Sequence, residues 1–143
     1  MTVKKWSIVA LVGLVCAVLL SGCSLNTPLP ESMDEETIIA KAEEVRDLIF
    51  AGEYEAVTNL IREDVRKDQE ITVQKVKALV ETYANPEDIG TFVKVNKTTV
   101  SGNNEGEEHG IVVFECKFTK KKVGVGVAFD PEMNLLGITL GRE

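Results

Sequence analysis

The hydrophobic pattern changes twice along the chain of 143 residues, and each change marks a different kind of structure. From Trp6 to Leu20 the residues are uncharged and mostly apolar. Over residues 35–85 apolar side chains recur every three or four positions, which is the period of an amphipathic helix. After Gly90 apolar and polar residues alternate, which is typical of strands with one buried face. The pattern therefore predicts an apolar leader, a helical half and a β half.

Three helices are predicted in the helical half. The first follows Ser32 and Glu35, which have the spacing of a capping box, and Gly52 is a suitable residue to end it. The second is expected over residues 53–65, and the third begins with Thr72 as its N-cap. The apolar stripes of the three helices are Ile38, Ile39, Ala42, Val45, Leu48 and Ile49; Tyr54, Val57, Leu60, Ile61 and Val65; and Val73, Val76, Leu79, Val80 and Tyr83.

Four antiparallel strands are predicted in the β half, over residues 91–100, 111–120, 123–129 and 135–140. Two of them alternate clearly. One face of the second strand carries Val112, Phe114, Cys116 and Phe118; on the third, Val123, Val125, Val127 and Phe129 lie opposite Gly124, Gly126 and Ala128. Because the helices precede all the strands, the fold class is α+β, with three N-terminal helices packed on a curved four-stranded antiparallel sheet.

The apolar leader has the organisation of a lipoprotein signal peptide. Lys4 and Lys5 precede an uncharged run that is too short for a membrane span of about 20 residues. The run ends in Leu20, Ser21, Gly22 and Cys23, which resemble the bacterial lipobox of an aliphatic residue, two small residues and a cysteine. The expected organisation is a signal peptide over residues 1–22, a lipid-anchored tether over 23–31 and a single domain over 32–143.

Cys23 is the expected site of lipidation. In lipoproteins of this kind the cysteine thiol accepts a diacylglycerol and the new amino terminus is often acylated as well, with palmitate among the expected chains. Two or three acyl chains give stable anchoring, whereas one chain gives only marginal binding. The expected location is the extracytoplasmic face of the cell membrane. The alternative is an uncleaved signal anchor in which Cys23 is an ordinary thiol.

The domain is acidic. The formal net charge of the whole chain is −7. Removal of residues 1–22 takes away Lys4 and Lys5, which leaves 14 basic and 23 acidic residues and a charge of −9. Such a domain lacks the basic footprint of a nucleic-acid-binding protein. Anionic headgroups repel it weakly, so the lipid has to hold it at the membrane.

Cysteine use is consistent with this organisation. Cys16 leaves with the signal peptide and Cys23 is lipidated, so Cys116 is the one thiol left in the mature chain. No intramolecular disulfide is then available. Because Cys116 alternates with Phe114 and Phe118, a buried thiol is expected rather than a catalytic nucleophile.

Several short segments resemble a bacterial family known as domain of unknown function 3887. They are FAGEYEAV (50–57), GTF (90–92), VFECKF (113–118), VGVAFD (125–130) and GI (137–138), and the resemblance spans roughly residues 34–141. The order of helices and final sheet also looks like the nuclear transport factor 2-like superfamily, which implies a cone-like fold. Family members occur as small lipoproteins and as N-terminal additions to α/β hydrolases. That usage implies an accessory or binding role and supplies no catalytic residues.

His109 is the one histidine, and it stands beside three glutamates in or near the predicted hairpin loop. One histidine with flexible glutamates lacks the converging geometry of a transition-metal site, so a polar surface loop is expected instead. No residues point to serine nucleophile chemistry or to a dinucleotide site. The sequence therefore gives no catalytic residues, no metal and no cofactor.

Four residues are candidates for the cone interior or a ligand-facing surface: Tyr54, Tyr83, Gly124 and Gly126. The tyrosines lie on helical stripes, where a core position is the commoner outcome. The glycines permit curvature or close approach to the sheet. Asp130 is expected to start a turn. Lys120 to Lys122 form a basic spot that is either a solvated hairpin tip or a docking spot for an anionic polymer or headgroup.

The expected function is that of a lipid-anchored, non-catalytic accessory or binding domain, with an unidentified small ligand or envelope protein as its partner. One alternative is a small enzyme, isomerase-like or hydrolase-like, that uses the cone as a pocket. Such an enzyme needs at least two ionisable groups buried together in that pocket. The other alternative is a structural module that homodimerises through the outer face of the sheet, as is common in the superfamily.

Overall fold

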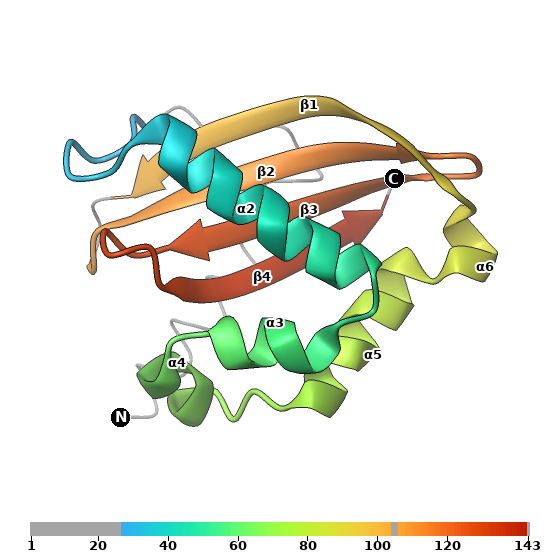
Figure 1. Ribbon diagram of the computed structural model, residues 1–143, viewed down its shortest axis with the longest axis horizontal. Helices are drawn as coiled ribbons and strands as arrows, with labels where there is room; N and C mark the ends of the chain where they lie inside the picture. Colours follow the sequence, from blue (N-terminus) through green and yellow to red (C-terminus); the bar gives the residue numbers. More distant parts are fainter. Residues whose placement is uncertain (1–26, 104–105, 143) are drawn as a thin grey trace.

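A computed structural model describes residues 27–103 and 106–142 (Figure 1). Within these ranges the helices are α2 (Glu35–Phe50), α3 (Tyr54–Leu60), α4 (Glu63–Asp68), α5 (Val73–Ala84) and α6 (Pro86–Ile89). The strands are β1 (Phe92–Asn103), β2 (His109–Phe118), β3 (Lys122–Phe129) and β4 (Leu135–Arg142). The predicted signal peptide and lipobox, with Leu20, Ser21, Gly22 and Cys23, lie outside the described residues. No helix within the described ranges is both long and apolar enough to span a membrane.

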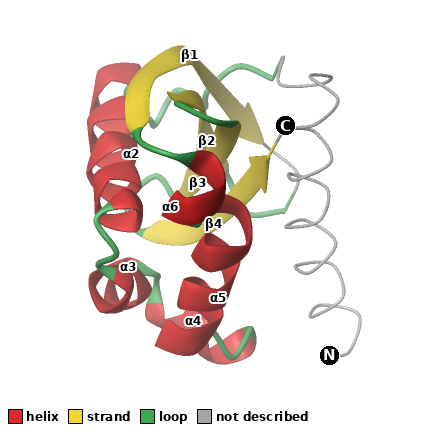
Figure 2. Ribbon diagram, turned by 90° about the vertical axis from the view of Figure 1, so that its right-hand side faces the viewer, coloured by secondary structure: helices red, strands yellow, loops and turns green. Residues whose placement is uncertain are grey.

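The four strands form one antiparallel sheet in the order β1-β2-β3-β4. Figure 1 shows α2 crossing one face of this curved sheet, where it contacts β2 and β3. Figure 2 shows α2 on one side of the sheet, with α3, α4 and α5 gathered below its β4 edge. The predicted α+β class, with helices packed on a curved four-stranded antiparallel sheet, is confirmed.

The core lies between the helices and one face of the sheet. Its strand residues, all at most 2% exposed, are Val112, Phe114, Cys116, Val123, Val125, Val127, Phe129, Leu135 and Leu140. Its helix residues include Ile38, Ala42, Val45 and Ile49 from α2, Val57 from α3, and Val76, Val80 and Ala84 from α5. Since alternate residues of a strand face opposite ways, Gly124, Gly126 and Ala128 lie on the outer face of the sheet. The alternation predicted for β2 and β3 is correct.

Residues next to α2 determine where the helix begins and ends, although the prediction of its N-cap is wrong. Asp34 is the N-cap, and its carboxylate accepts from the backbone N–H of Thr37 at 3.0 Å. Ser32 instead donates from its hydroxyl to the carboxylate of Glu108 at 3.0 Å, because the chain still turns at Ser32 before the helix begins. Gly52 follows the helix with φ +76, a left-handed conformation that favours glycine, as the sequence predicts.

The predicted second helix, residues 53–65, is interrupted. Ile61 is extended and forms a parallel bridge with Leu135 at the start of β4. The backbone N–H of Arg62 donates to the carbonyl of Leu135 at 2.7 Å, and α4 begins one residue later. This contact with a distant strand outweighs the local helical pattern. It leaves Leu60, predicted to face inward, 48% exposed at the end of α3.

Residues 27–33 are packed against the ends of β1 and β2. The backbone N–H of Gly102 donates to the carbonyl of Thr27 at 2.9 Å. A Cβ on Gly102 would contact the carbonyl oxygen of Pro28, so only glycine leaves room for this approach. Figure 1 shows this first described segment, in blue, beside the end of β1. Residues 27–31, predicted to be a tether, therefore pack with the domain.

Gly102→Ala is expected to loosen residues 27–31 and to lower the free energy of unfolding by about 2 kcal/mol, as overpacking does. The added Cβ would meet backbone atoms of Pro28 and Leu29, and backbone atoms have no alternative rotamer. Gly137→Ala is the matched control, because a Cβ on this β4 glycine meets nothing within 4 Å. Denaturant unfolding of both variants checks the prediction. Equal stability of the two would show that residues 27–31 do not pack here.

Candidate functional site

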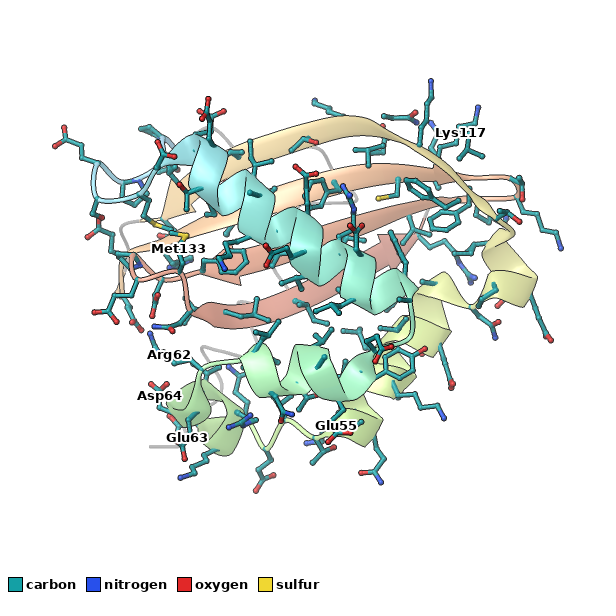
Figure 3. All side chains as sticks on the ribbon, viewed as in Figure 1. Glu55, Arg62, Glu63, Asp64, Lys117 and Met133 are labelled. Atoms are coloured by element: carbon teal, nitrogen blue, oxygen red, sulfur yellow. The ribbon has the colours of Figure 1, made fainter. Side chains whose placement is uncertain are left out.

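Arg62 joins three segments that lie far apart in the sequence. It stands between α3 and α4, Glu107 precedes β2, and Asp130 follows β3. Its guanidinium binds the side chains of Glu107, Asp130 and the neighbouring Asp64. We call these four residues the Arg62 cluster. Figure 3 shows Arg62 and Asp64 at the same end of the molecule as Met133.

All five N–H donors of the Arg62 guanidinium are used. Nε and Nη2 donate to the two oxygens of Asp64 at 2.7 and 3.0 Å. Nη1 and Nη2 donate to the two oxygens of Glu107 at 2.6 and 3.0 Å. Nη1 also donates to Oδ2 of Asp130 at 3.0 Å. Two carboxylates are thus held in the bidentate geometry that arginine provides, and a third is held by one bond.

Asp130 is the buried member of the Arg62 cluster, with a side chain 6% exposed. Its Oδ1 accepts from the backbone N–H groups of Glu132 at 3.0 Å and Asn134 at 2.8 Å. Its Oδ2 accepts from the side-chain amide of Asn134 at 3.0 Å as well as from Arg62. Asp130 therefore organises the β3–β4 turn, as the sequence predicts. Because its carboxylate accepts four hydrogen bonds, it stabilises the fold and is not available as a catalytic base.

Charge pairing sets the protonation of the Arg62 cluster. Hydrogen bonds from Arg62 hold the pKa values of Glu107 and Asp64 below their ordinary values, and the bonds to Glu107 and Asp64 raise the pKa of Arg62. Burial raises the pKa of Asp130, but its hydrogen bonds from Asn134, Arg62 and Glu132 outweigh burial and leave that pKa lowered. The three carboxylates are ionised at neutral pH and outnumber the one guanidinium that binds them.

His109 is buried rather than part of a surface loop, so the sequence-based expectation is wrong. The β1–β2 ladder continues to the pair Asn103 and His109, which brings the histidine into the sheet at 6% exposure. Its Nδ1 lies 2.7 Å from the carbonyl oxygen of Glu107. Since a carbonyl only accepts, Nδ1 carries the hydrogen. Nε2 is buried and has no hydrogen-bond partner in the described part of the chain.

The Arg62 cluster is suited to holding segments together rather than to catalysis. A general base needs an accessible lone pair near substrate, and a nucleophile needs such a base beside it. Here the carboxylates accept from one guanidinium that has no donor left. No three His, Cys, Asp or Glu residues among those described are grouped so as to hold a metal ion. The cluster links α4, the β1–β2 connection and the β3–β4 turn to one another through ion pairs.

Comparison with known proteins places this fold in a family. Residues 42–138 match the family described as a protein of unknown function, DUF3887. The chain belongs to this family. The DUF3887 fold is also similar to an NMR structure of a protein from Ruminococcus gnavus ATCC 29149, with a TM-score of 0.65, 24% sequence identity, and coverage of 79% of this chain and 96% of that chain. At this identity the likeness shows a shared fold. No curated protein matches the chain significantly.

The four residues predicted to face a cone or ligand do not meet on one surface of this DUF3887 domain. Tyr54 begins α3 and Tyr83 lies on α5, and both are half-buried against the core. Gly124 and Gly126 lie on the outer face of β3, because the valines that alternate with them belong to the core. The ligand-facing role of these residues stays a prediction, as does a homodimer through the outer face.

Cys116 is a fully buried free thiol in the core of the DUF3887 domain. Burial raises its pKa to about 11, and the positive charge of Arg46 opposes this only in part. A thiol with that pKa is almost wholly protonated at neutral pH and is a poor nucleophile. The expected burial on the face of Phe114 and Phe118 is confirmed.

Cys116 is expected to react slowly with thiol reagents in the folded protein and quickly after unfolding. Cys116→Ala should lower the free energy of unfolding by about 1 kcal/mol, because it leaves a small cavity. Peptide mass spectrometry after timed labelling measures the rate at this residue. Equally fast labelling of folded and unfolded protein would contradict the assignment of this strand face.

Proposed function

We propose that this protein is a lipid-anchored, extracytoplasmic accessory domain that binds a ligand or an envelope partner without catalysing a reaction. The observation that carries the proposal is the short distance along the chain between Cys23 and the fold. Thr27 is already bound to Gly102, so at most three residues, 24–26, separate the lipobox cysteine from the packed part of the chain. Four extended steps cover at most about 14 Å, which holds the domain against the membrane surface.

The lipobox and the basic, apolar leader support anchoring through Cys23. The acidic charge of the mature chain supports it too, because this domain has no overall electrostatic attraction to anionic lipid. The curved sheet with helices on one face supports a nuclear transport factor 2-like fold. Family membership alone assigns no substrate, since the family has no defined activity.

A binding role is favoured over a small enzyme by what fills the space between helices and sheet. A catalytic pocket there would bring two ionisable groups together. The buried side chains of the core that fill it are apolar, and Ile49, Val57, Phe114 and Leu140 among them are at most 2% exposed. The buried ionisable groups His109 and Asp130 lie instead at the end of the sheet, beside or within the Arg62 cluster.

Cell fractionation with external protease tests the location. The full-length chain with a C-terminal tag is expressed in a bacterium that processes lipoproteins. We expect it in the membrane fraction, resistant to high salt and released by detergent. Protease added to cells stripped of their outer layers should remove the tag. A tag that stays protected in intact membranes, or protein recovered in the cytoplasm, would contradict the proposal.

A further inference from the structure

Two neighbouring apolar side chains are exposed at the start of β1. Phe92 is 45% exposed and Val93 is 49% exposed. Val93 has no partner on β2, because the register shifts between Phe92 and Lys94, and an extra residue of this kind turns its side chain out of the regular alternation. Adjacent large apolar residues at a surface are typical of a contact site rather than of a solvated loop.

The exposed ring of Phe92 is held in place by two further aromatic rings. Its centroid lies 6.1 Å from that of Phe50 and 5.5 Å from that of Phe118. Phe50, at the end of α2, is half-buried, and Phe118 belongs to the core. One side of the Phe92 ring is therefore fixed against the fold while the other side faces solvent. Such a ring loses little conformational freedom on binding.

Positive charge surrounds the exposed pair. Lys94 follows it on β1, and the backbone N–H of Lys120 donates to the carbonyl of Ile89 at 2.9 Å, which places this turn beside the start of β1. The segments that meet here, residues 87–97 and 115–121, carry five lysines and three carboxylates, whereas the whole chain has 16 basic and 23 acidic residues. We call the apolar pair together with Lys94 and Lys120 the Phe92 tip.

The Phe92 tip lies on the same edge of the sheet as the route to Cys23. β1 is an outer strand of the described sheet. The backbone N–H of Gly102, near the other end of β1, donates to Thr27, so it points to the free side of the strand. Val93 and Gly102 are nine residues apart, which corresponds to about 30 Å. Figure 1 shows β1 along one edge of the molecule, with the first described segment at one end and α6 at the other.

We propose that the Phe92 tip inserts into the headgroup region of an anionic bilayer, so that β1 lies along the membrane. This inference rests on the anchoring at Cys23 proposed above. Apolar side chains enter the boundary between headgroups and acyl chains, and lysines beside them attract anionic lipid. β1 itself carries Lys94 and Lys97 and no carboxylate. Because the anchor holds the Phe92 tip close to the bilayer, a weak second contact is enough to orient the domain.

Tryptophan fluorescence in vesicles tests this proposal. Trp6 is the one tryptophan of the chain and would leave with the signal peptide, so Phe92→Trp places a single reporter in the Phe92 tip. The full-length chain is expressed, extracted and reconstituted into phosphatidylglycerol vesicles with or without brominated acyl chains, which quench nearby tryptophan. We expect strong quenching in Phe92→Trp and Val93→Trp, and weaker quenching in phosphatidylcholine or at high salt. The wild-type protein is the blank for any retained Trp6.

Matched variants separate the Phe92 tip from the rest of the surface. Leu60 is 48% exposed, but it lies on α3, below the β4 edge, so Leu60→Trp should be quenched little (Figure 2). In the Phe92→Trp background, Lys94→Glu should shift the tip toward its free state by about fivefold or more. Lys75→Glu makes the same change of charge on α5 and should shift it by less than about twofold. Equal quenching at Leu60, or equal effects of the two charge variants, would overturn the proposal.

The intact mass of the reconstituted protein distinguishes failure of the Phe92 tip from failure of the anchor. Protein that carries lipid on Cys23 but is not quenched at Phe92 or Val93 would overturn the tip contact and leave the anchor intact. Protein without that lipid would contradict the anchor, and quenching above the wild-type blank would still show whether the Phe92 tip enters the bilayer. Blue-shifted emission without quenching would mean that protein covers the Phe92 tip instead of lipid, and would also overturn the proposal.

Discussion

Cys23→Ala is expected to leave an unprocessed precursor and to abolish incorporation of labelled fatty acid. In the proposed signal peptide, Leu20, Ser21 and Gly22 would position the cysteine for cleavage, and its thiol would receive the diacylglycerol. Without it neither the lipid bond nor the cut is made. Gel mobility and metabolic labelling of cells that express the variant measure both steps. The effect is all-or-none, since no other residue in the leader supplies the thiol in that context.

Cys16→Ala is the matched control for this experiment. Cys16 lies four residues before Leu20 in the apolar run and should be lost with the signal peptide. Its replacement removes a thiol of the same leader and is expected to leave processing and labelling unchanged. Normal fatty-acid labelling of Cys23→Ala protein would contradict the assignment of the anchor.

Arg62→Ala is expected to lower the free energy of unfolding by about 2–3 kcal/mol, or by about 10 °C in the thermal midpoint. The change removes five charge-assisted hydrogen bonds and leaves three neighbouring carboxylates without their shared cation. The largest part of this loss should come from Asp130, because its carboxylate would remain buried, at 6% exposure, without its cation. Denaturant unfolding measures the loss. Arg142→Ala is the control: its ion pair with Asp88 at 3.7 Å is exposed and should contribute at most about 0.5 kcal/mol.

The contribution of the Arg62 cluster should also depend on pH. The pKa values of Asp64, Glu107 and Asp130 are lowered in the folded state. Their stabilisation is therefore complete above the unfolded pKa values of about 4 and is lost as the pH falls through the lowered folded values. The stability difference between wild type and Arg62→Ala should be constant between about pH 5 and pH 7 and should shrink below about pH 4. A difference independent of pH would show that Arg62 acts through packing alone.

The sequence pattern predicted correctly those features that depend on residues close together in the chain. Thr72 caps α5 as expected, with its hydroxyl accepting from the N–H of Lys75 at 3.2 Å. The alternation of Phe114 and Cys116 predicted the core face of β2, because burial on one face leaves a period of two in the sequence. The left-handed position after α2 required glycine and was predicted at Gly52.

Contacts between distant segments could not be predicted in this way. The break after α3 depends on Leu135, which the helical stripe around Ile61 does not reveal. The partners of Arg62 lie in two separate connections, and neither Glu107 nor Asp130 carries a local signal of that pairing. Lys120 to Lys122 were visible as a basic run. The opposition of Lys94 and Lys117 depends on a register altered by two bulges in β1, so this pairing appears only in the folded sheet.

The packing of residues 27–31 bears on how freely the domain could turn above the membrane if Cys23 is its anchor. A free tether of nine residues would let the domain turn in any direction above the membrane. If Cys23 is lipidated, as proposed, packing of residues 27–31 on Gly102 leaves at most three residues between lipid and fold, which would limit the directions available to the sheet. With that anchor, the end that carries the Arg62 cluster would lie next to the membrane.

The intact mass of the protein extracted from membranes tests the central claim most directly. We expect a single chain that begins at Cys23 and is heavier than its amino-acid sequence by a diacylglycerol and, where the host adds one, a further acyl chain. Fragmentation should place the added mass on Cys23. An unmodified chain that begins at Met1, or a mature chain that begins at any other residue, would contradict the account.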